Sequence, residues 1–547
     1  MIDAPQQSDH PILHWDNTGL PSFTVTLAHL DIDALDDFNG SFGDTGGDIS
    51  LARTLSWLEE CMHTHAECGM TAEPSLPHRV LNLDPLDSIT GDVKLVELKA
   101  NISGQYACLS YCWGSSMPYK TTTRNIAIHK RGIPYKKLPK TFRDAISFCR
   151  KLRIRWLWID SLCILQDDEN DWRHEAASMA DIYANAVITL AASKSANSSE
   201  GLYNSGRLVD TKRFCQIHSS GHLYTMYARR YQRIEHVSAK NFSLQQDVFP
   251  LLSRGWAYQE RILSPRVLHF GPKELQFECR YLQCECGERN SFGASPSEHR
   301  NRWETICMGY AQRVLSFTKD TLPAIAGVAK RFSKVKRGRY LAGLWEDDLI
   351  PGLTWTLAGK RSNIRPDPRL PSWSWASNMP GATIATGKPK ISKVQATVHD
   401  IVYITVGEDP FGEIEYAHLD IESDVIPALF NWEMLQHQKA PNEMYRGGRL
   451  KEELYQPAEL EIGLVHADAW SHSLSLETAP LEVMLLSLVI GNHHVQFIDD
   501  PNDRDQEIFL ILIKADNCGE KYKRIGLCQA WNISYATTRL RRTIRLL

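Results

Sequence analysis

Between residues 106 and 193 the sequence alternates short apolar runs with segments of helical spacing, and this alternation constrains the fold more than any other feature. Helices are predicted over 141–152, where Thr141 and Asp144 have the spacing of a capping box, and over about 171–186. Three apolar runs are typical of strands, at 106–109, 155–159 and 186–192. Strands separated by helices predict an α/β fold in which helices flank a parallel sheet.

The sequence after residue 390 has a different character. It contains strand-like runs rich in Val, Ile and Leu, at 394–406, 414–421, 458–465, 482–497 and 507–514. These runs predict a β-rich region with antiparallel pairing that packs one apolar face against the preceding domain. The expected division of the chain is an N-terminal arm with a Cys/His helix (1–75), an α/β domain (76–290), a helical and Trp-rich connecting region (291–390) and a β-rich C-terminal region (391–547).

The composition argues against several classes of function. A chain of 547 residues with 43% hydrophobic and 23% charged residues is typical of a multidomain globular protein. A net charge of −4 gives no reason to expect nucleic-acid binding, and no apolar run is long enough for a membrane span. The first residues lack the features of a secretory signal, so the thirteen cysteines are expected to be reduced in the cytoplasm. Because phosphate-loop and dinucleotide-binding motifs are absent, no organic cofactor is expected.

Polar and aromatic side chains follow two of the predicted strands at the point where each strand ends. Ser110, Tyr111 and Trp113 follow the first, and Asp160 and Ser161 follow the second. Ligands of parallel sheets collect beyond the carboxyl ends of the strands, so we expect a binding site for a small molecule or nucleotide here. Asp160 is either a catalytic carboxylate or a capping residue, and its side chain is expected to bond backbone N–H groups of the next turn.

A carboxylate on the following helix is the second candidate catalytic group. Trp172 and Tyr183 fall on one apolar stripe of this helix and are expected to contact the substrate. Glu175 lies at the edge of the stripe, about 60° from Trp172 for a rotation of ~100° per residue. Burial there would raise the pKa of the carboxyl and suit acid–base chemistry. Alternatively, Glu175 forms an ion pair with a basic residue such as Arg143 or Arg155.

Three ordered motifs in this block are characteristic of one protein family. They are L-S-Y-x-W-G at residues 109–114, W-I-D-x-L-C-I-x-Q at 158–166 and W-x-x-E-x-x-x-M-x-x-I-Y at 172–183. On these motifs the block resembles the fungal heterokaryon incompatibility (HET) domain. The segments 253–264 and 370–376 resemble later elements of long HET-type proteins, whereas residues 410–500 carry no motif that can be matched.

The resemblance implies a fold, a cellular role and a chemistry. HET domains are remotely similar to TIR domains, several of which cleave NAD at the nicotinamide glycosidic bond with a glutamate carried on a helix. On this sequence the matching glutamate is Glu175. HET-type proteins trigger regulated cell death when they assemble with incompatible protein partners, so the resemblance implies an effector of fungal non-self recognition.

A group of metal-binding residue types precedes the α/β block. Cys61, His65 and Cys68 share one face of a helix predicted over 50–68, and this face is expected to be buried. Thiolates and an imidazole suit a structural zinc ion, and the alternative is a buried packing face without metal. Further ligands are available downstream, at Cys279, Cys284 and Cys286.

Two other functions fit the sequence. A cofactor-independent enzyme of secondary metabolism, such as a cyclase or dehydratase, would need a deep apolar cavity. The tryptophans that could line such a cavity, or else pack in the core, are Trp113, Trp156, Trp158, Trp256, Trp373 and Trp375. The remaining hypothesis is an interaction module without catalysis. A cleft of nucleotide width at Glu175 would instead favour NAD hydrolysis.

Overall fold

The structure is a computed structural model that describes two compact units. The smaller unit contains the antiparallel hairpin β6 (Thr211–Ser219) and β7 (His222–Arg229), and every other element described below belongs to the larger unit. The predicted N-terminal arm before residue 44 lies outside the described residues. The described residues are 44–69, 74–84, 91–99, 102–114, 119–204, 211–219, 222–229, 248–272, 275–280, 282–285, 288–291, 302–334, 336, 338–357, 369–379, 384–385, 390–430, 461–467, 481–492, 506–515, 521–531 and 539–547.

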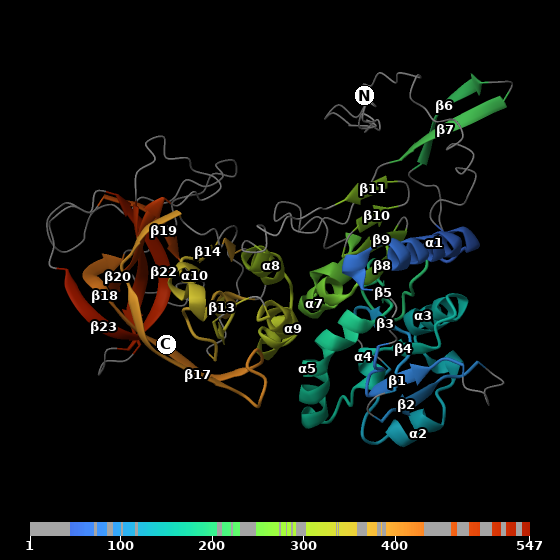
Figure 1. Ribbon diagram of the computed structural model, residues 1–547, viewed down its shortest axis with the longest axis horizontal. Helices are drawn as coiled ribbons and strands as arrows, with labels where there is room; N and C mark the ends of the chain where they lie inside the picture. The colour runs from blue at the N-terminus through green and yellow to red at the C-terminus, as the bar shows by residue number, and fades with distance from the viewer. Residues whose placement is uncertain are drawn as a thin grey trace. The chain divides into compact units, whose positions relative to one another are not determined.

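A nine-stranded mixed sheet forms the centre of the α/β domain (Figure 1). Its strand order is β11 (Glu288–Ser291), β10 (Leu282–Glu285), β9 (Leu275–Cys279), β8 (Arg266–Phe270), β5 (Ile188–Ala191), β3 (Tyr106–Ser110), β4 (Trp156–Trp158), β1 (Arg79–Asn82) and β2 (Lys94–Glu97). The four central strands from β8 to β4 are parallel, and the pairings on both sides of them are antiparallel. The predicted parallel sheet is therefore correct at the centre and wrong on both sides of it. From β8 to β11 the strands are consecutive, and their short connections allow only antiparallel pairing, whereas β1 pairs with β4, which is distant in the sequence.

Helices connect the parallel strands as predicted. α3 (Lys140–Lys151) lies between β3 and β4 in the chain, and α4 (Asp160–Cys163) and α5 (Glu169–Asn185) lie between β4 and β5. α5 begins after Asp168, whose carboxylate accepts from two backbone N–H groups of the first turn. Among the described residues, no helix combines the length and the apolar character that crossing a membrane requires.

The capping box predicted at the start of α3 does not form. The helix begins after Pro139 without a side-chain cap. Instead, the Thr141 hydroxyl accepts from the backbone N–H of Gly201 at 3.1 Å, and the Asp144 carboxylate accepts from that of Leu202 at 2.9 Å. The prediction was wrong because both polar side chains serve a tertiary contact with the loop that follows β5.

The connecting region packs on the α/β domain through closely spaced helices. It contains α8 (Arg302–Ala311) and α9 (Pro323–Phe332), and α9 lies against α5 and α7 (Gly255–Leu263). Gly327 is a point of close approach, since a Cβ there would lie 2.3 Å from the Cβ of Ala180 on α5. The Gly327 backbone N–H also donates to the side-chain oxygen of Gln259 on α7 at 2.7 Å. A glycine is therefore needed here for the helices to meet.

The C-terminal region forms a second sheet with the predicted antiparallel character. Its strands are β16 (Lys390–Val394), β17 (Thr397–Thr405), β18 (Ile414–Phe430), β19 (Glu461–Ala467), β20 (Leu481–Asn492), β21 (Gln506–Lys514), β22 (Lys521–Trp531) and β23 (Leu540–Leu546). Their order is β16-β20-β21-β22-β23-β18-β17, with β19 paired to β22. The sheet closes on itself because β18 also pairs with β20, and the described pairings are antiparallel apart from β22 with β23.

A buried arginine joins this second sheet to the connecting region. Arg524 on β22 is fully buried, and its guanidinium donates to the backbone oxygens of Leu353 and Trp355, each at 2.6 Å. The guanidinium carbon also lies 3.4 Å from the centroid of the Trp355 ring. Buried side chains from Leu58 to Leu546 form one continuous apolar cluster. The C-terminal region therefore packs against the rest of the larger unit through the connecting region. The predicted packing directly against the α/β domain stays a prediction.

The close approach at Gly327 predicts the effect of adding a single methyl group. Gly327→Ala should lower the free energy of unfolding by roughly 1–3 kcal/mol, the usual cost of overpacking, because the new Cβ overlaps Ala180. Helix propensity alone would predict the opposite sign, since alanine is favoured over glycine by about 1 kcal/mol. Urea unfolding followed by tryptophan fluorescence measures the change.

Gly132→Ala is the matched control, because a Cβ at Gly132 would meet nothing within 4 Å. A Gly327→Ala variant at least as stable as this control would contradict the contact between α9 and α5.

Candidate functional site

The residues predicted at the ends of β3 and β4 lie together. The indole N–H of Trp113 donates to the Asp160 carboxylate at 2.8 Å, and the Tyr111 hydroxyl donates to the Ser161 hydroxyl at 2.9 Å. Asp160 also accepts from the backbone N–H of Ser161 at 2.6 Å, which confirms its predicted bond to the following turn. Because the two strands are parallel, their carboxyl ends meet at one edge of the sheet and the side chains that follow can bond directly.

An arginine from a distant segment completes this group. Arg254, which directly precedes α7, donates to the backbone oxygen of Tyr111. Burial alone would lower the pKa of its guanidinium, but the neighbouring acidic groups of Cys112, Glu260 and Asp160 outweigh burial and raise that pKa. Arg254 therefore stays positively charged beside two carboxyl groups.

The second of these carboxyl groups, Glu260 on α7, is only 5% exposed. Burial raises the pKa of Glu260 to about 7, because removal from water disfavours the charged form. Arg254 and hydrogen bonds with Ser110 and Tyr183 lower this pKa, whereas the nearby Asp160 adds to the rise. Burial likewise raises the pKa of Asp160, against an opposing effect of Arg254. Glu260 can thus take up or release a proton near neutral pH.

We call these eight residues the strand-end cluster: Ser110, Tyr111, Trp113, Asp160, Ser161, Tyr183, Arg254 and Glu260. The first six are predicted from the sequence as site residues, and the structure brings them together. Sequence reasoning misses Arg254 and Glu260, although both lie in the segment 253–264 that carries part of the family resemblance. The available signal for Glu260 was a run of three polar residues, Gln259 to Arg261, between apolar residues of a predicted family element. Arg254 precedes α7 and has no such signal.

Glu175 on α5 lies in a different group of charges. Its buried carboxylate accepts from the Arg79 guanidinium at 3.1 Å and lies 3.0 Å from Nδ1 of His78. Two further acceptors of Arg79 are the Asp171 carboxylate and the backbone oxygen of Cys163. The predicted burial of Glu175 is confirmed, and its ion pair is with Arg79 rather than with Arg143 or Arg155. A catalytic role for Glu175 stays a prediction.

Trp172 also makes its contacts away from the strand ends. Its ring packs edge-on against Trp256, with the centroids 6.3 Å apart, and the Lys319 ammonium lies 5.5 Å from the ring. Trp172 therefore joins α5 to α7 and to the connecting region. Its predicted contact with a substrate stays a prediction.

Other tryptophans of the predicted aromatic group pack in the core. Trp158, Trp373 and Trp375 are fully buried, whereas Trp113, Trp156 and Trp256 are partly buried. Trp375 lines a cavity of about 30 Å³ together with Trp303, Trp345 and Trp355. A cavity of this size holds a water molecule and is far smaller than the sites that bind drug-sized ligands. Its walls therefore favour the packing interpretation of these rings.

The predicted helix that carries the metal-binding residue types is interrupted. α1 (Asp48–Thr64) ends before His65, which has extended backbone angles, and the short 3-10 helix η3 (Ala66–Cys68) follows. The continuous helix over 50–68 was therefore wrong, although Cys61, His65 and Cys68 are all buried as predicted. Two of the further candidate ligands, the Cys284 side chain and Cys286, lie outside the described residues.

These features define an α/β domain with a cluster of an arginine and two carboxyl groups at the ends of its parallel strands. Residues 106–260 match the family model of the heterokaryon incompatibility protein (HET). This segment is a HET domain, as its motifs predict, and it contains the whole strand-end cluster.

One curated relative shows how far the similarity reaches. A stretch of 124 residues is 31% identical to Heterokaryon incompatibility protein 6, OR allele, of Neurospora crassa. The matched stretch covers 21% of this chain and 18% of that protein, so the chain spans less than a fifth of the relative's length. No solved structure matches the chain.

The raised pKa of Glu260 predicts a pH-dependent stability. A carboxyl group whose pKa rises from 4.5 to about 7 on folding stabilises the folded state below pH 4.5, and this contribution is lost as the pH rises through about 7. Relative to Glu260→Gln, which cannot ionise, the wild-type protein should lose up to roughly 3 kcal/mol over this interval. Chemical denaturation at a series of pH values on both sides of neutrality measures the difference.

The control for this experiment is Glu169→Gln, which changes an exposed carboxylate on α5 and should follow the wild-type pH profile. Parallel profiles for the wild type and Glu260→Gln would contradict the raised pKa.

Proposed function

We propose that this chain is an effector of fungal non-self recognition whose HET domain hydrolyses the glycosidic bond of NAD or a related nucleotide. The observation that carries the proposal is the strand-end cluster, which lies entirely within the matched HET segment. The cellular role is supported by the Neurospora relative, which is named as a heterokaryon incompatibility protein.

The exposed part of the strand-end cluster offers groups that suit a nucleotide. Trp113, Asp160 and Arg254 are each partly exposed, whereas the rest of the cluster is buried. A guanidinium pairs well with phosphate oxygens, and an indole ring can stack on a base. The Asp160 carboxylate is suited to stabilise the positive charge that develops on the ribose as its bond to the base breaks.

Hydrolysis also requires a group that takes a proton from the attacking water. In this reaction the water oxygen bonds to the ribose carbon, the C–N bond breaks, and the base leaves with the bonding electron pair. With a pKa raised to about 7, Glu260 is partly ionised near neutral pH, and it lies among Ser110, Tyr183 and Arg254. In its carboxylate form it is suited to receive the released proton through this hydrogen-bonded group. The reaction needs no redox partner.

The contacts of Glu175 favour a structural role over catalysis. The carboxylate is held by Arg79, whose side chain is only 3% exposed. Removing one partner of a buried ion pair leaves the other charge uncompensated, at a cost of about 3–5 kcal/mol. We therefore place the chemistry at Asp160 and Glu260, while the family resemblance continues to predict Glu175.

Turnover of NAD by purified variants distinguishes these assignments. Asp160→Asn and Glu260→Gln should each lower kcat by about 100-fold or more while retaining cooperative unfolding. Glu175→Gln should be less stable but active at temperatures where it is folded, and Glu169→Gln should match the wild type. Inactive Glu175→Gln together with active Asp160→Asn and Glu260→Gln would return the catalytic role to Glu175.

The cellular role has a separate test. Expression of the full chain in a fungal host should arrest growth, and Asp160→Asn should abolish this effect at an equal protein level. Growth arrest by Asp160→Asn would assign the toxicity to protein interactions, as expected of a non-catalytic module. A wild-type protein without any effect on growth, in the presence of incompatible partners, would contradict the effector role.

A further inference from the structure

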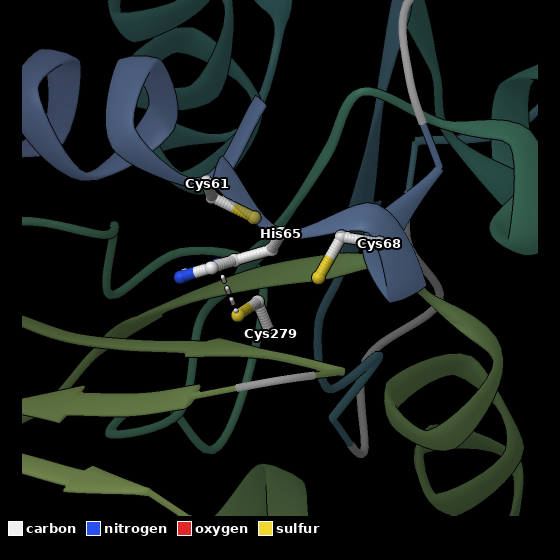
Figure 2. Close-up of side chains that lie close together, drawn as sticks. All are labelled: Cys61, His65, Cys68 and Cys279. Atoms are coloured by element: carbon white, nitrogen blue, oxygen red, sulfur yellow. Dashed lines mark hydrogen bonds between the residues drawn. The ribbon is translucent and has the colours of Figure 1, made fainter. Parts of the chain in front are cut away.

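Four side chains point toward one another beside the end of α1 (Figure 2). Cys61 lies in the last turn of α1, His65 follows the helix, Cys68 ends η3 and Cys279 ends β9. One sulfur or ring nitrogen atom from each residue lies within 4.8 Å of all the others. Nδ1 of His65 is 3.6 Å from Sγ of Cys279. Three of the residues are buried and Cys279 is partly buried.

We propose that these four residues bind one zinc ion in a structural Cys₃His site. Structural zinc is tetrahedral, and at a Zn–S distance of about 2.3 Å its sulfur ligands lie about 3.8 Å apart. The observed ligand atoms would therefore have to approach one another by no more than about 1 Å on binding the ion. Four protein ligands leave no open position for water or substrate, so the site is structural rather than catalytic.

The break in the helix at His65 allows the four residues to come together around one point. In a continuous helix Cys61 and Cys68 would share a face but lie about 10 Å apart along the axis, at 1.5 Å per residue. One zinc ion cannot bridge that separation. The extended backbone of His65, with φ −103° and ψ 93°, turns the chain so that Cys68 comes back to the same point.

The surroundings of the four residues supply the charge that such a site requires. A zinc ion with three thiolates and a neutral imidazole carries one net negative charge. The guanidinium of Arg266 on β8 is buried and donates to Sγ of Cys61 at 3.2 Å. It also donates to the backbone oxygen of Gly69 at 3.1 Å. Arg266 thus offsets the negative charge and orients one ligand, as partners of metal ligands commonly do.

A zinc ion here would fasten α1 to strand β9 of the central sheet. Ligands Cys61, His65 and Cys68 belong to the N-terminal segment, whereas Cys279 is 214 residues beyond His65. The same two elements already meet through the stacked rings of Trp57 and Phe277, whose centroids are 5.6 Å apart. Metal binding closes a long loop, and its free energy adds to that of folding.

Metal analysis of the full chain, purified without chelator, tests the site. We expect about one equivalent of zinc per chain and a fall in melting temperature on chelation that added zinc reverses. Less than about a tenth of an equivalent, together with unchanged melting after chelator treatment, would overturn the proposal. A disulfide between Cys61 and Cys68 in the unreduced protein, detected by mass spectrometry, would also overturn it.

A matched pair of variants tests the ligand set. Cys279→Ser should lose the zinc, whereas Cys149→Ser, which changes a buried thiol on α3 outside the four residues, should retain it. Titration of the wild-type apoprotein with Co²⁺ gives a readout that does not depend on how a variant folds. Tetrahedral thiolate ligation should give intense visible bands and sulfur-to-metal charge transfer. An octahedral spectrum, or zinc retained by Cys279→Ser, would contradict the four-ligand site.

Discussion

Buried and partly buried arginine side chains hold the larger unit together, because their guanidinium groups find acceptors on elements that are distant in the sequence. Arg79 binds groups on α4 and α5 from its place on β1. Arg254 links the start of α7 to the end of β3, and Arg524 links β22 to the connecting region. A guanidinium left without these acceptors would cost several kcal/mol, so arrangements that separate the elements are disfavoured. Burial of apolar side chains favours a compact fold, and the arginines favour the one arrangement of the elements in which their guanidinium groups reach these acceptors.

Two buried glutamates on adjacent helices show that the surroundings of a carboxyl group determine the role that it suits. Glu175 on α5 faces a guanidinium and an imidazole, which fix its carboxylate in a network of ion pairs. Glu260 on α7 is close to a guanidinium, but it also lies near the Asp160 carboxyl group and two hydroxyl groups. The environment of Glu175 suits a carboxylate that links secondary-structure elements, and that of Glu260 suits a carboxyl group that transfers a proton. The position of either residue on its helix predicts that its side chain is buried. It does not predict which of these two environments surrounds the carboxyl group.

Local patterns explain which parts of the molecule could be predicted. The apolar runs that end at Ser110 and Asp160 mark the ends of two strands. Because these strands pair in parallel, the residues that follow them lie together. Arg254 could not be assigned to this group, because its contact with Tyr111 spans 143 residues and no local spacing records it. The antiparallel edge strands and the break at His65 were missed for a related reason. The pairing of β1 with β4 and the approach of Cys279 to His65 each join segments that are distant in the sequence, and neither propensity nor periodicity indicates them.

The path of the chain from α7 into β8 connects the two sites that we propose. Glu260 belongs to the strand-end cluster, and Arg266, six residues later, donates to Cys61. Between them, the Ser264 hydroxyl bonds to the backbone oxygen of Glu260 and contacts Thr189 on β5. If this short segment responds to occupancy at one end, the two binding equilibria are thermodynamically linked. Linkage is reciprocal, so any factor by which metal changed the affinity for a nucleotide would equal the factor by which the nucleotide changed the affinity for metal.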